Sequence, residues 1–246
     1  MPIWSYLATR TRAVLPYLAT FAWAFVAFTA GQVAALVALL RWSHGDLDYL
    51  HAVPYDGAAV TLSVLVLNPV TVAVLLLAVR ITGADLAEYL GLVWPRMRSV
   101  VVGIIGIVVI IALTDAVLFA TGSAVVSTFQ VVSYTTAATE GVLPLMLFAA
   151  VIVAPAGEEI MFRGYLFRGF VRSERSAWPA IVVISLLWAA PHLQYDLSGI
   201  SEIFVAGLFL GWMRWRSGST LLTFLLHALF NLEGTIETVL QVKHVF

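Results

Sequence analysis

The chain has 246 residues, of which 61% are hydrophobic and only 11% are charged. Soluble globular domains are about 45–50% apolar and about 25% charged, so this composition excludes a water-soluble fold. The formal net charge of −1 offers no basic face for nucleic acid. The absence of cysteine excludes disulfides, thiol nucleophiles and cysteine-ligated zinc. The composition is that of a polytopic integral membrane protein.

Apolar segments of membrane-spanning length occur along most of the chain. A bilayer core about 30 Å thick needs about 20 apolar residues in a helix. We therefore predict an all-α, polytopic membrane helix bundle of about seven to eight transmembrane helices with a buried polar site. The seven expected segments are about Ala13–Leu40, Ala58–Val79, Val100–Ala120, Val142–Phe170, Trp178–Leu193, Leu197–Met213 and Thr220–Leu232. An eighth segment requires the residues after Glu233 to fold back.

The last three segments are short, and His227, Asn231 and Glu233 interrupt the seventh. Lipid cannot satisfy such polar groups, so we expect these segments to lie inside the bundle.

Basic residues gather in alternate connections between the segments. They precede the first segment and lie between the second and third, the fourth and fifth, and the sixth and seventh (Arg10, Arg12, Arg80, Arg96, Arg98, Arg168, Arg172, Arg175, Arg214 and Arg216). The other connections carry acidic residues, with Arg41 as their single arginine. Because cytoplasmic loops are enriched in lysine and arginine, we predict a cytoplasmic N-terminus. We expect an integral membrane protein, located in the inner membrane if the source is a bacterium.

Ionisable or strongly polar groups interrupt four of the apolar segments. They are Glu158-Glu159 with Arg163, Trp188 with His192, His227 with Asn231, and Asp115. Each charge near the bilayer centre costs about 2.5–3.5 kcal/mol on insertion scales, so a functional site is the default hypothesis. Asp115 lies nearer the outer end of its helix, and we predict a structural or interfacial role for it.

The two adjacent glutamates cannot do the same job. On a helix of 3.6 residues per turn they point about 100° apart. Glu159 and Arg163 stand at i and i+4, the spacing of an intrahelical ion pair. Glu158 then has no local partner, which suits a general base. The alternative is that both acids pair with arginines of the loop.

The two histidine motifs place polar groups on shared helix faces. His227 and Asn231 are at i and i+4, so they can donate to a developing oxyanion, or one of them can bind a metal. The alternative is that they join neighbouring helices. Pro191 removes a helical hydrogen bond, which predicts a kink with room for water or substrate beside His192. Trp188 lies one turn earlier on the same face.

Three of the polar groups reach a similar depth. At 1.5 Å per residue from the cytoplasmic ends of their helices, Glu158, His192 and His227 lie roughly 15, 20 and 16 Å deep. Scattered structural residues need not share a depth. The convergence therefore predicts a single site near mid-membrane.

The motif order Glu-Glu-x-x-x-Arg, aromatic-x-x-x-His, His-x-x-x-Asn resembles the CPBP family of intramembrane proteases, also called the Abi family. Its members include the type II CAAX prenyl endopeptidases. The run Leu86–Leu92 resembles the family's Leu-Gly-Leu entry, and the resemblance covers roughly Asp85 to Asn231. It implies N-terminal transmembrane helices over 1–84 and a CPBP-type catalytic membrane domain over 85–246, in one structural unit.

Two features depart from the family pattern. Trp188 replaces the usual phenylalanine, which keeps an aromatic pocket wall but narrows the pocket. The chain also ends soon after the third motif, so the family's final helix is expected to be short or missing.

The resemblance implies an endopeptidase that hydrolyses a peptide bond inside the membrane. The implied roles are water activation by Glu158, assistance by His192, oxyanion stabilisation by His227 and Asn231, and structural support by Glu159 and Arg163. The family is often labelled metalloprotease, and a divalent metal such as zinc on Glu158, His192 and His227 is the alternative. We expect the metal-free form, because the chain lacks His-Glu-x-x-His and shows no obvious supporting carboxylate for either imidazole.

The expected partners are the lipid bilayer and a membrane-bound peptide or protein substrate, such as a lipid-modified C-terminus or a bacteriocin-like peptide. No nucleic-acid partner is expected. Two other functions compete. A non-catalytic scaffold or immunity protein should have lost Glu158 or a histidine, and all are retained. A proton-coupled transporter should show inverted repeats or paired broken helices, and neither is visible.

Overall fold

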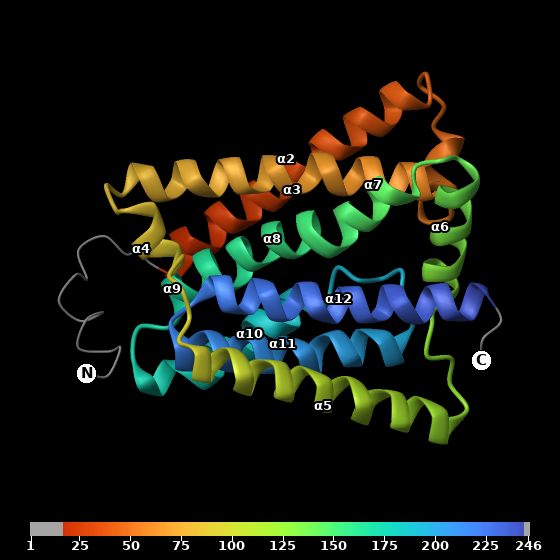
Figure 1. Ribbon diagram of the computed structural model, residues 1–246. Coiled ribbons are helices and arrows are strands. Elements are labelled where there is room, and N and C mark those ends of the chain that lie inside the picture. The colour runs from red at the N-terminus through yellow and green to blue at the C-terminus, as the bar shows by residue number, and fades with distance from the viewer. Residues whose placement is uncertain (1–16, 244–246) are drawn as a thin grey trace.

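The computed structural model describes residues 17–243, and within that range every regular element is helical (Figure 1). The long helices lie roughly alongside one another, and they are α2 (Tyr17–Trp42), α3 (Gly57–Ile81), α5 (Met97–Thr121), α10 (Glu174–Ala189), α11 (Leu197–Ser217), α12 (Thr220–Val242) and the continuous run 143–170. Arg10, Arg12 and the expected start of the first segment at Ala13 lie outside the described residues.

Five helices are long and apolar enough to cross a membrane: α2, α3, α5, the run 143–170 and α11. The expected count of seven to eight spans is therefore not confirmed. Helix α10 has only 16 residues, fewer than the roughly 20 that a span needs. Helix α12 continues to Val242 instead of ending near Leu232, so the described part of the chain contains no separate eighth segment.

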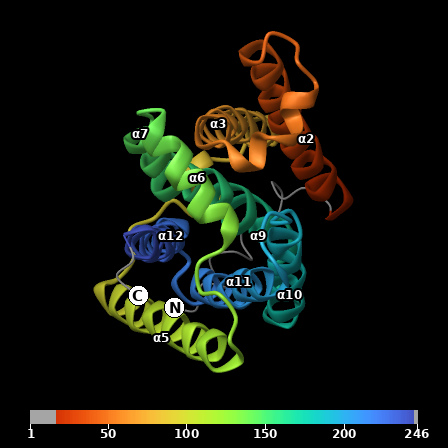
Figure 2. The same ribbon diagram turned by 90° about the vertical axis from the view of Figure 1, so that its right-hand side faces the viewer.

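Helices α2 and α3 pack closely through small residues. The buried face of α2 includes Ala24, Ala27 and Gly31, which let the two backbones approach. A Cβ on Gly31 would lie only 2.3 Å from the hydroxyl oxygen of Thr71. That hydroxyl donates to the carbonyl of Ala27 at 3.3 Å. This pair forms one side of the bundle (Figure 2).

The run 143–170 alternates between α- and π-helical geometry. Its parts are α7 (Leu143–Phe148), η4 (Ala149–Val153), α8 (Ala154–Glu159), η5 (Ile160–Leu166) and α9 (Phe167–Phe170), with η4 and η5 π-helical. Single π-helical turns are rare in proteins, and those that do occur are frequently found at functional sites. Here two of them flank the short helix α8, which carries both glutamates.

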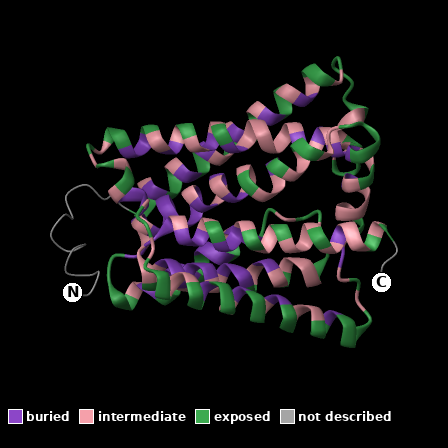
Figure 3. Cartoon of the chain, viewed as in Figure 1, coloured by how far each residue is buried: buried purple, intermediate pink, exposed green. Residues whose placement is uncertain are grey.

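Burial is uneven along the bundle. Buried residues gather toward the end where α4 and α9 lie, whereas α5 is mostly exposed (Figure 3). Trp188, Arg163 and Tyr165 are among the largest fully buried side chains. The exposed side chains of α5 include Ile105 and Leu113, so its outer face is apolar and suited to lipid.

Helix α4 (Leu86–Leu90) positions the Leu-Gly-Leu run against the last two helices. It ends at Gly91, whose φ of 68° is left-handed and favours glycine. A Cβ on Gly91 would lie 2.2 Å from the guanidinium of Arg214. The carbonyl of Leu90 accepts a hydrogen bond of 2.5 Å from the hydroxyl of Thr220, the first residue of α12.

Three local elements were not expected from the sequence. The 3₁₀ turns η2 (Asp48–His51) and η3 (Val53–Tyr55) lie before α3, and helix α6 (Thr128–Thr139) begins at a capping box formed by Ser127 and Gln130. The predicted kink at Pro191 is wrong. Helix α10 ends at Ala189, because the missing N–H and the ring of Pro191 do not continue it.

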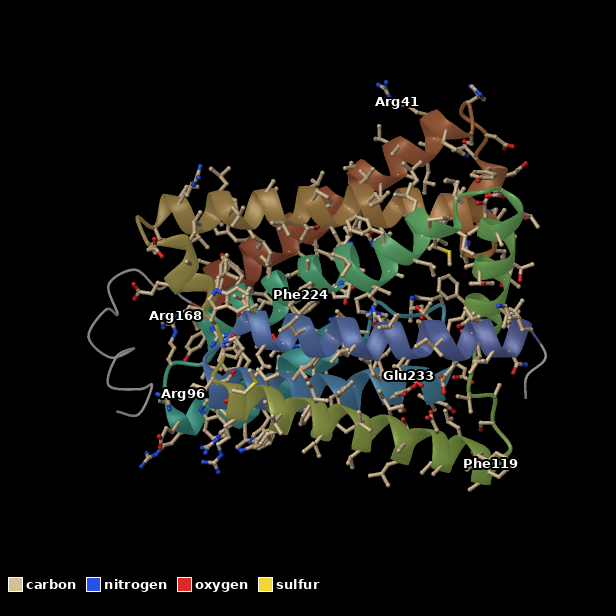
Figure 4. All side chains as sticks on the ribbon, viewed as in Figure 1. Arg41, Arg96, Phe119, Arg168, Phe224 and Glu233 are labelled. Atoms are coloured by element: carbon tan, nitrogen blue, oxygen red, sulfur yellow. The ribbon has the colours of Figure 1, made fainter. Side chains whose placement is uncertain are left out.

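Three of the described arginines separate along the bundle as the sequence indicated. Arg96 and Arg168 lie at one end, and Arg41 lies at the opposite end (Figure 4). Which end faces the cytoplasm stays a prediction.

Candidate active site

Glu159 and Arg163 form the expected ion pair inside the helix run. The Nη1 of Arg163 donates to Oε1 of Glu159 at 2.8 Å, and both side chains are essentially inaccessible to solvent. Arg163 also donates to the carbonyl of Gly207 on α11 at 3.3 Å. The predicted pairing is therefore confirmed, and it joins the fourth span to α11.

Glu158 points to a different set of partners. Its side chain keeps 24% exposure, while that of Glu159 has none. The indole Nε1 of Trp188 donates to Oε2 of Glu158 at 2.5 Å. The Nε2 of His227 lies 4.0 Å from the same oxygen. Glu158 thus lacks a partner on its own helix, as expected, and meets residues of α10 and α12.

His227 contacts both glutamates through its two ring nitrogens. Its Nδ1–H donates to Oε1 of Glu159 at 3.0 Å, and its Nε2 faces Glu158. A neutral imidazole with its proton on Nδ1 has only an acceptor at Nε2. His227 can therefore donate from Nε2 to an oxyanion only as the imidazolium. With Glu158, Glu159 and Arg163 ionised, that imidazolium makes the four-residue group electrically neutral.

Trp188 lies at the centre of the site. The guanidinium carbon of Arg163 is 4.2 Å from the centroid of the indole. The rings of His227 and His192 approach the indole edge-on, at centroid distances of 5.0 and 5.9 Å. The residue expected to form a pocket wall therefore also contacts the acid and both histidines.

His192 lies in the connection after α10, half-buried. Its Nδ1–H donates to the carbonyl of Trp188 at 2.8 Å. The neutral ring then keeps an acceptor at Nε2, which can take a proton. Among the described residues, the contacts of His192 run through Trp188 and Tyr195, not directly to Glu158.

Asn231 has a backbone partner. Its Nδ2 donates to the carbonyl of Ala150 in η4 at 2.8 Å. The contact joins α12 to the fourth span. The sequence had left open the alternative that Asn231 joins neighbouring helices, and this contact does so. An oxyanion role for Asn231 stays a prediction and requires the second hydrogen on Nδ2.

Two residues near the site were not identified from the sequence. Asn68 is buried in α3, and a Cβ on Gly157 would lie 2.2 Å from its Oδ1. An amide inside an apolar segment was an available signal. Tyr195 lies three residues after His192, and the centroids of the two rings are 6.3 Å apart.

Asp115 belongs to a separate acidic group toward the ends of α5 and α12. Carboxylate oxygens of Asp115, Glu233 and Glu237 lie within 4.8 Å of one another. Glu202 is nearby and accepts a hydrogen bond of 3.0 Å from Thr114. This grouping was not predicted from the sequence.

The three residues considered for a metal do not fit a three-ligand site as the structure places them. Among the described residues, the ligand atoms of Glu158, His192 and His227 do not all lie within 4.8 Å of one another. One premise against a metal was nevertheless wrong. Glu159 does accept from His227, as a supporting carboxylate behind a metal-bound histidine would.

Comparisons with known proteins locate the resemblance. Residues 140–232 match the family model "Type II CAAX prenyl endopeptidase Rce1-like". A relative from Escherichia coli, the "Uncharacterized 24.3 kDa protein", is 41% identical over 86 residues, which cover 34% of this chain and 39% of the relative. No solved structure matches. All the proposed site residues lie within 140–232, and over this region the chain is similar to the Rce1-like family, in agreement with the resemblance to the CPBP family.

Proposed function

We propose that this protein is an intramembrane endopeptidase in which Glu158 activates water for hydrolysis of a peptide bond. The observation that carries the proposal is the setting of the Glu158 carboxylate within the Rce1-like region. It is partly exposed, fixed by the indole of Trp188, and 4.0 Å from the imidazole of His227. General bases need this combination of access and fixed geometry.

The reaction uses one water molecule and no covalent enzyme intermediate. Glu158 takes a proton from the water molecule as the water oxygen attacks the peptide carbonyl carbon. The negative charge then develops on the carbonyl oxygen, where the imidazolium of His227 donates a hydrogen bond. Glu158 returns the proton to the departing nitrogen as the C–N bond breaks, which leaves an amine and a carboxylic acid, and the acid then loses its proton to become a carboxylate. His192 assists through the acceptor at Nε2.

Glu159 supports this chemistry without taking part in it. It is fully buried, accepts from Arg163 and orients His227 through Nδ1. A carboxylate behind an imidazole fixes the ring and stabilises its charged form. The two adjacent glutamates therefore have separate roles.

The proposed substrate is a membrane-anchored peptide, for example one with a lipid-modified C-terminus, as the name of the matching family suggests. The apolar outer faces of the helices support a site reached from within the bilayer. We also propose that the end of the bundle holding Arg96 and Arg168 faces the cytoplasm, because cytoplasmic loops are rich in arginine.

The test is the substitution Glu158→Gln, which keeps shape and removes the base. The assay is cleavage of a farnesylated peptide ending in a CAAX sequence, alongside proteomics of membrane peptides from cells with either form. We expect turnover to fall by about 10²–10⁴-fold while the protein still inserts and folds. Glu140→Gln, at an exposed residue outside the site, is the matched control. Full activity in Glu158→Gln would remove Glu158 from the mechanism.

A further inference from the structure

The carbonyl of Ala150 lacks its helical donor. In η4 the N–H of Ala154 bonds to the carbonyl of Ala149, five residues back, instead of to Ala150. The same five-residue register assigns residue 155 as the donor to Ala150. Residue 155 is proline, which has no N–H.

Asn231 supplies the missing hydrogen bond from another helix. Its Nδ2 donates to the carbonyl of Ala150 at 2.8 Å. A polar backbone group without a partner is costly inside a membrane, so a side-chain donor at this point stabilises the π-helical turn. A side-chain amide thus does the work of the backbone N–H that Pro155 lacks.

Helix α12 holds the segment 150–159 at both ends. Asn231 bonds to Ala150 at one end, and one turn earlier His227 bonds to Glu159 at the other. Glu158 lies between these two contacts, next to the second. A shift of η4 would therefore change how the Glu158 carboxylate meets Trp188 and His227.

We propose that Asn231 is a positioning residue that substitutes for the N–H absent at Pro155 and so fixes the place of Glu158. The role of Asn231 rests on the proposed function only in its expected effect on turnover. The geometric part concerns the helix itself and holds for any activity.

The test restores the donor on the backbone. Asn231→Ala removes the side-chain donor, and Asn231→Leu removes it with little change in volume. Adding Pro155→Ala to either variant returns an N–H at the position that the π register assigns to Ala150. Pro155→Ala alone gives the baseline for the double variants.

Three measurements are made on each protein in detergent. The first is the midpoint of thermal unfolding. The second is the rate at which N-ethylmaleimide labels the thiol introduced by Glu158→Cys in each background, which is unique because the native chain has no cysteine. The third is turnover of the farnesylated CAAX peptide by the same variants with Glu158 intact.

We expect both single variants at Asn231 to lower the midpoint by about 2–4 °C, the effect of one lost hydrogen bond in a chain of this size. We expect the labelling rate at position 158 to change several-fold. In the double variants, we expect the midpoint and the labelling rate to equal those of Pro155→Ala alone. Turnover should recover with them.

Other outcomes separate this assignment from the proposed function. Recovery of the midpoint and labelling without recovery of turnover would show that Asn231 acts directly on the substrate, which overturns the positioning role. An unchanged midpoint and labelling rate in both single variants, or no recovery in either double variant, also overturns it. If the unaltered protein cleaves nothing, the proposed function fails, and the first two measurements still test the role of Asn231.

Discussion

The indole of Trp188 donates a 2.5 Å hydrogen bond to the carboxylate of Glu158 across 30 residues of sequence. The family that the motifs resemble usually carries phenylalanine here, and a phenyl ring has no such donor. In this chain the aromatic wall therefore also fixes the proposed base.

Trp188→Phe tests this contact. The phenyl ring can keep its packing against Arg163 and His227 but cannot donate to Glu158. A hydrogen bond to a charged group contributes about 1.5–3 kcal/mol, so we expect turnover to fall by about tenfold or more. Trp178→Phe, at a half-exposed residue of the same helix, is the control. Equal turnover in the two variants would show that the hydrogen bond has no part in the reaction.

Glu159→Gln should act first on stability. Its carboxylate is fully buried and accepts from both Arg163 and His227. Removal of one member of a buried ion pair costs about 3–5 kcal/mol, which lowers the unfolding midpoint of a chain this size by about 6 °C or more. Thermal unfolding in detergent measures the effect, with Glu140→Gln as the control. A stable but inactive Glu159 variant beside an active Glu158→Gln would reverse the roles assigned to the two acids.

The part of the site that follows from local geometry was predictable. Glu159 and Arg163 are four residues apart on one helix, so their pairing follows from the helical repeat. The grouping of Glu158 with His227 also followed, because both residues interrupt apolar segments at a similar distance from basic helix ends. The partner of His227 did not follow, since Glu159 lies 68 residues away and depth counting cannot tell which glutamate a histidine meets.

The sequence could not reveal features that depend on exact helix register. The π-helical turns on either side of α8 move the side chains relative to an ideal helix, and apart from Pro155 no residue type marks them. The bond from Asn231 to Ala150 depends on that register. The existence of helix α10 was easier to predict than its end before Pro191. Proline either kinks or ends a helix according to what packs around it.

The orientation can be tested with single cysteines, because the native chain has none. Arg175 and Glu140 are both exposed, and the arginine pattern assigns them to opposite sides of the membrane. In intact cells we expect a membrane-impermeant maleimide to label Glu140→Cys and not Arg175→Cys. Both should react after the cells are opened. Labelling of Arg175→Cys from outside would invert the proposed topology.

Chelation and elemental analysis can separate a metal-free mechanism from a metal-bound one. The contact between His227 and Glu159 suits either, because a carboxylate behind an imidazole supports a charged ring and a ligating ring alike. The number of available ligands favours the metal-free form. Glu158 and His227 approach to 4.0 Å, but His192 bonds to the carbonyl of Trp188 and does not complete a compact set among the described residues.

We expect turnover of the farnesylated peptide to survive extensive chelation, with zinc well below one atom per chain by elemental analysis. His227→Gln should then keep partial activity, because its amide can still donate to the oxyanion. A metal site predicts the reverse, since loss of a ligating histidine empties it and chelation abolishes turnover until the metal returns. Glu237→Gln, in the separate acidic group, controls for ions bound elsewhere. One zinc per chain that is lost in His227→Gln, retained in Glu237→Gln and proportional to activity would make Glu158 a metal ligand or the base for a metal-bound water.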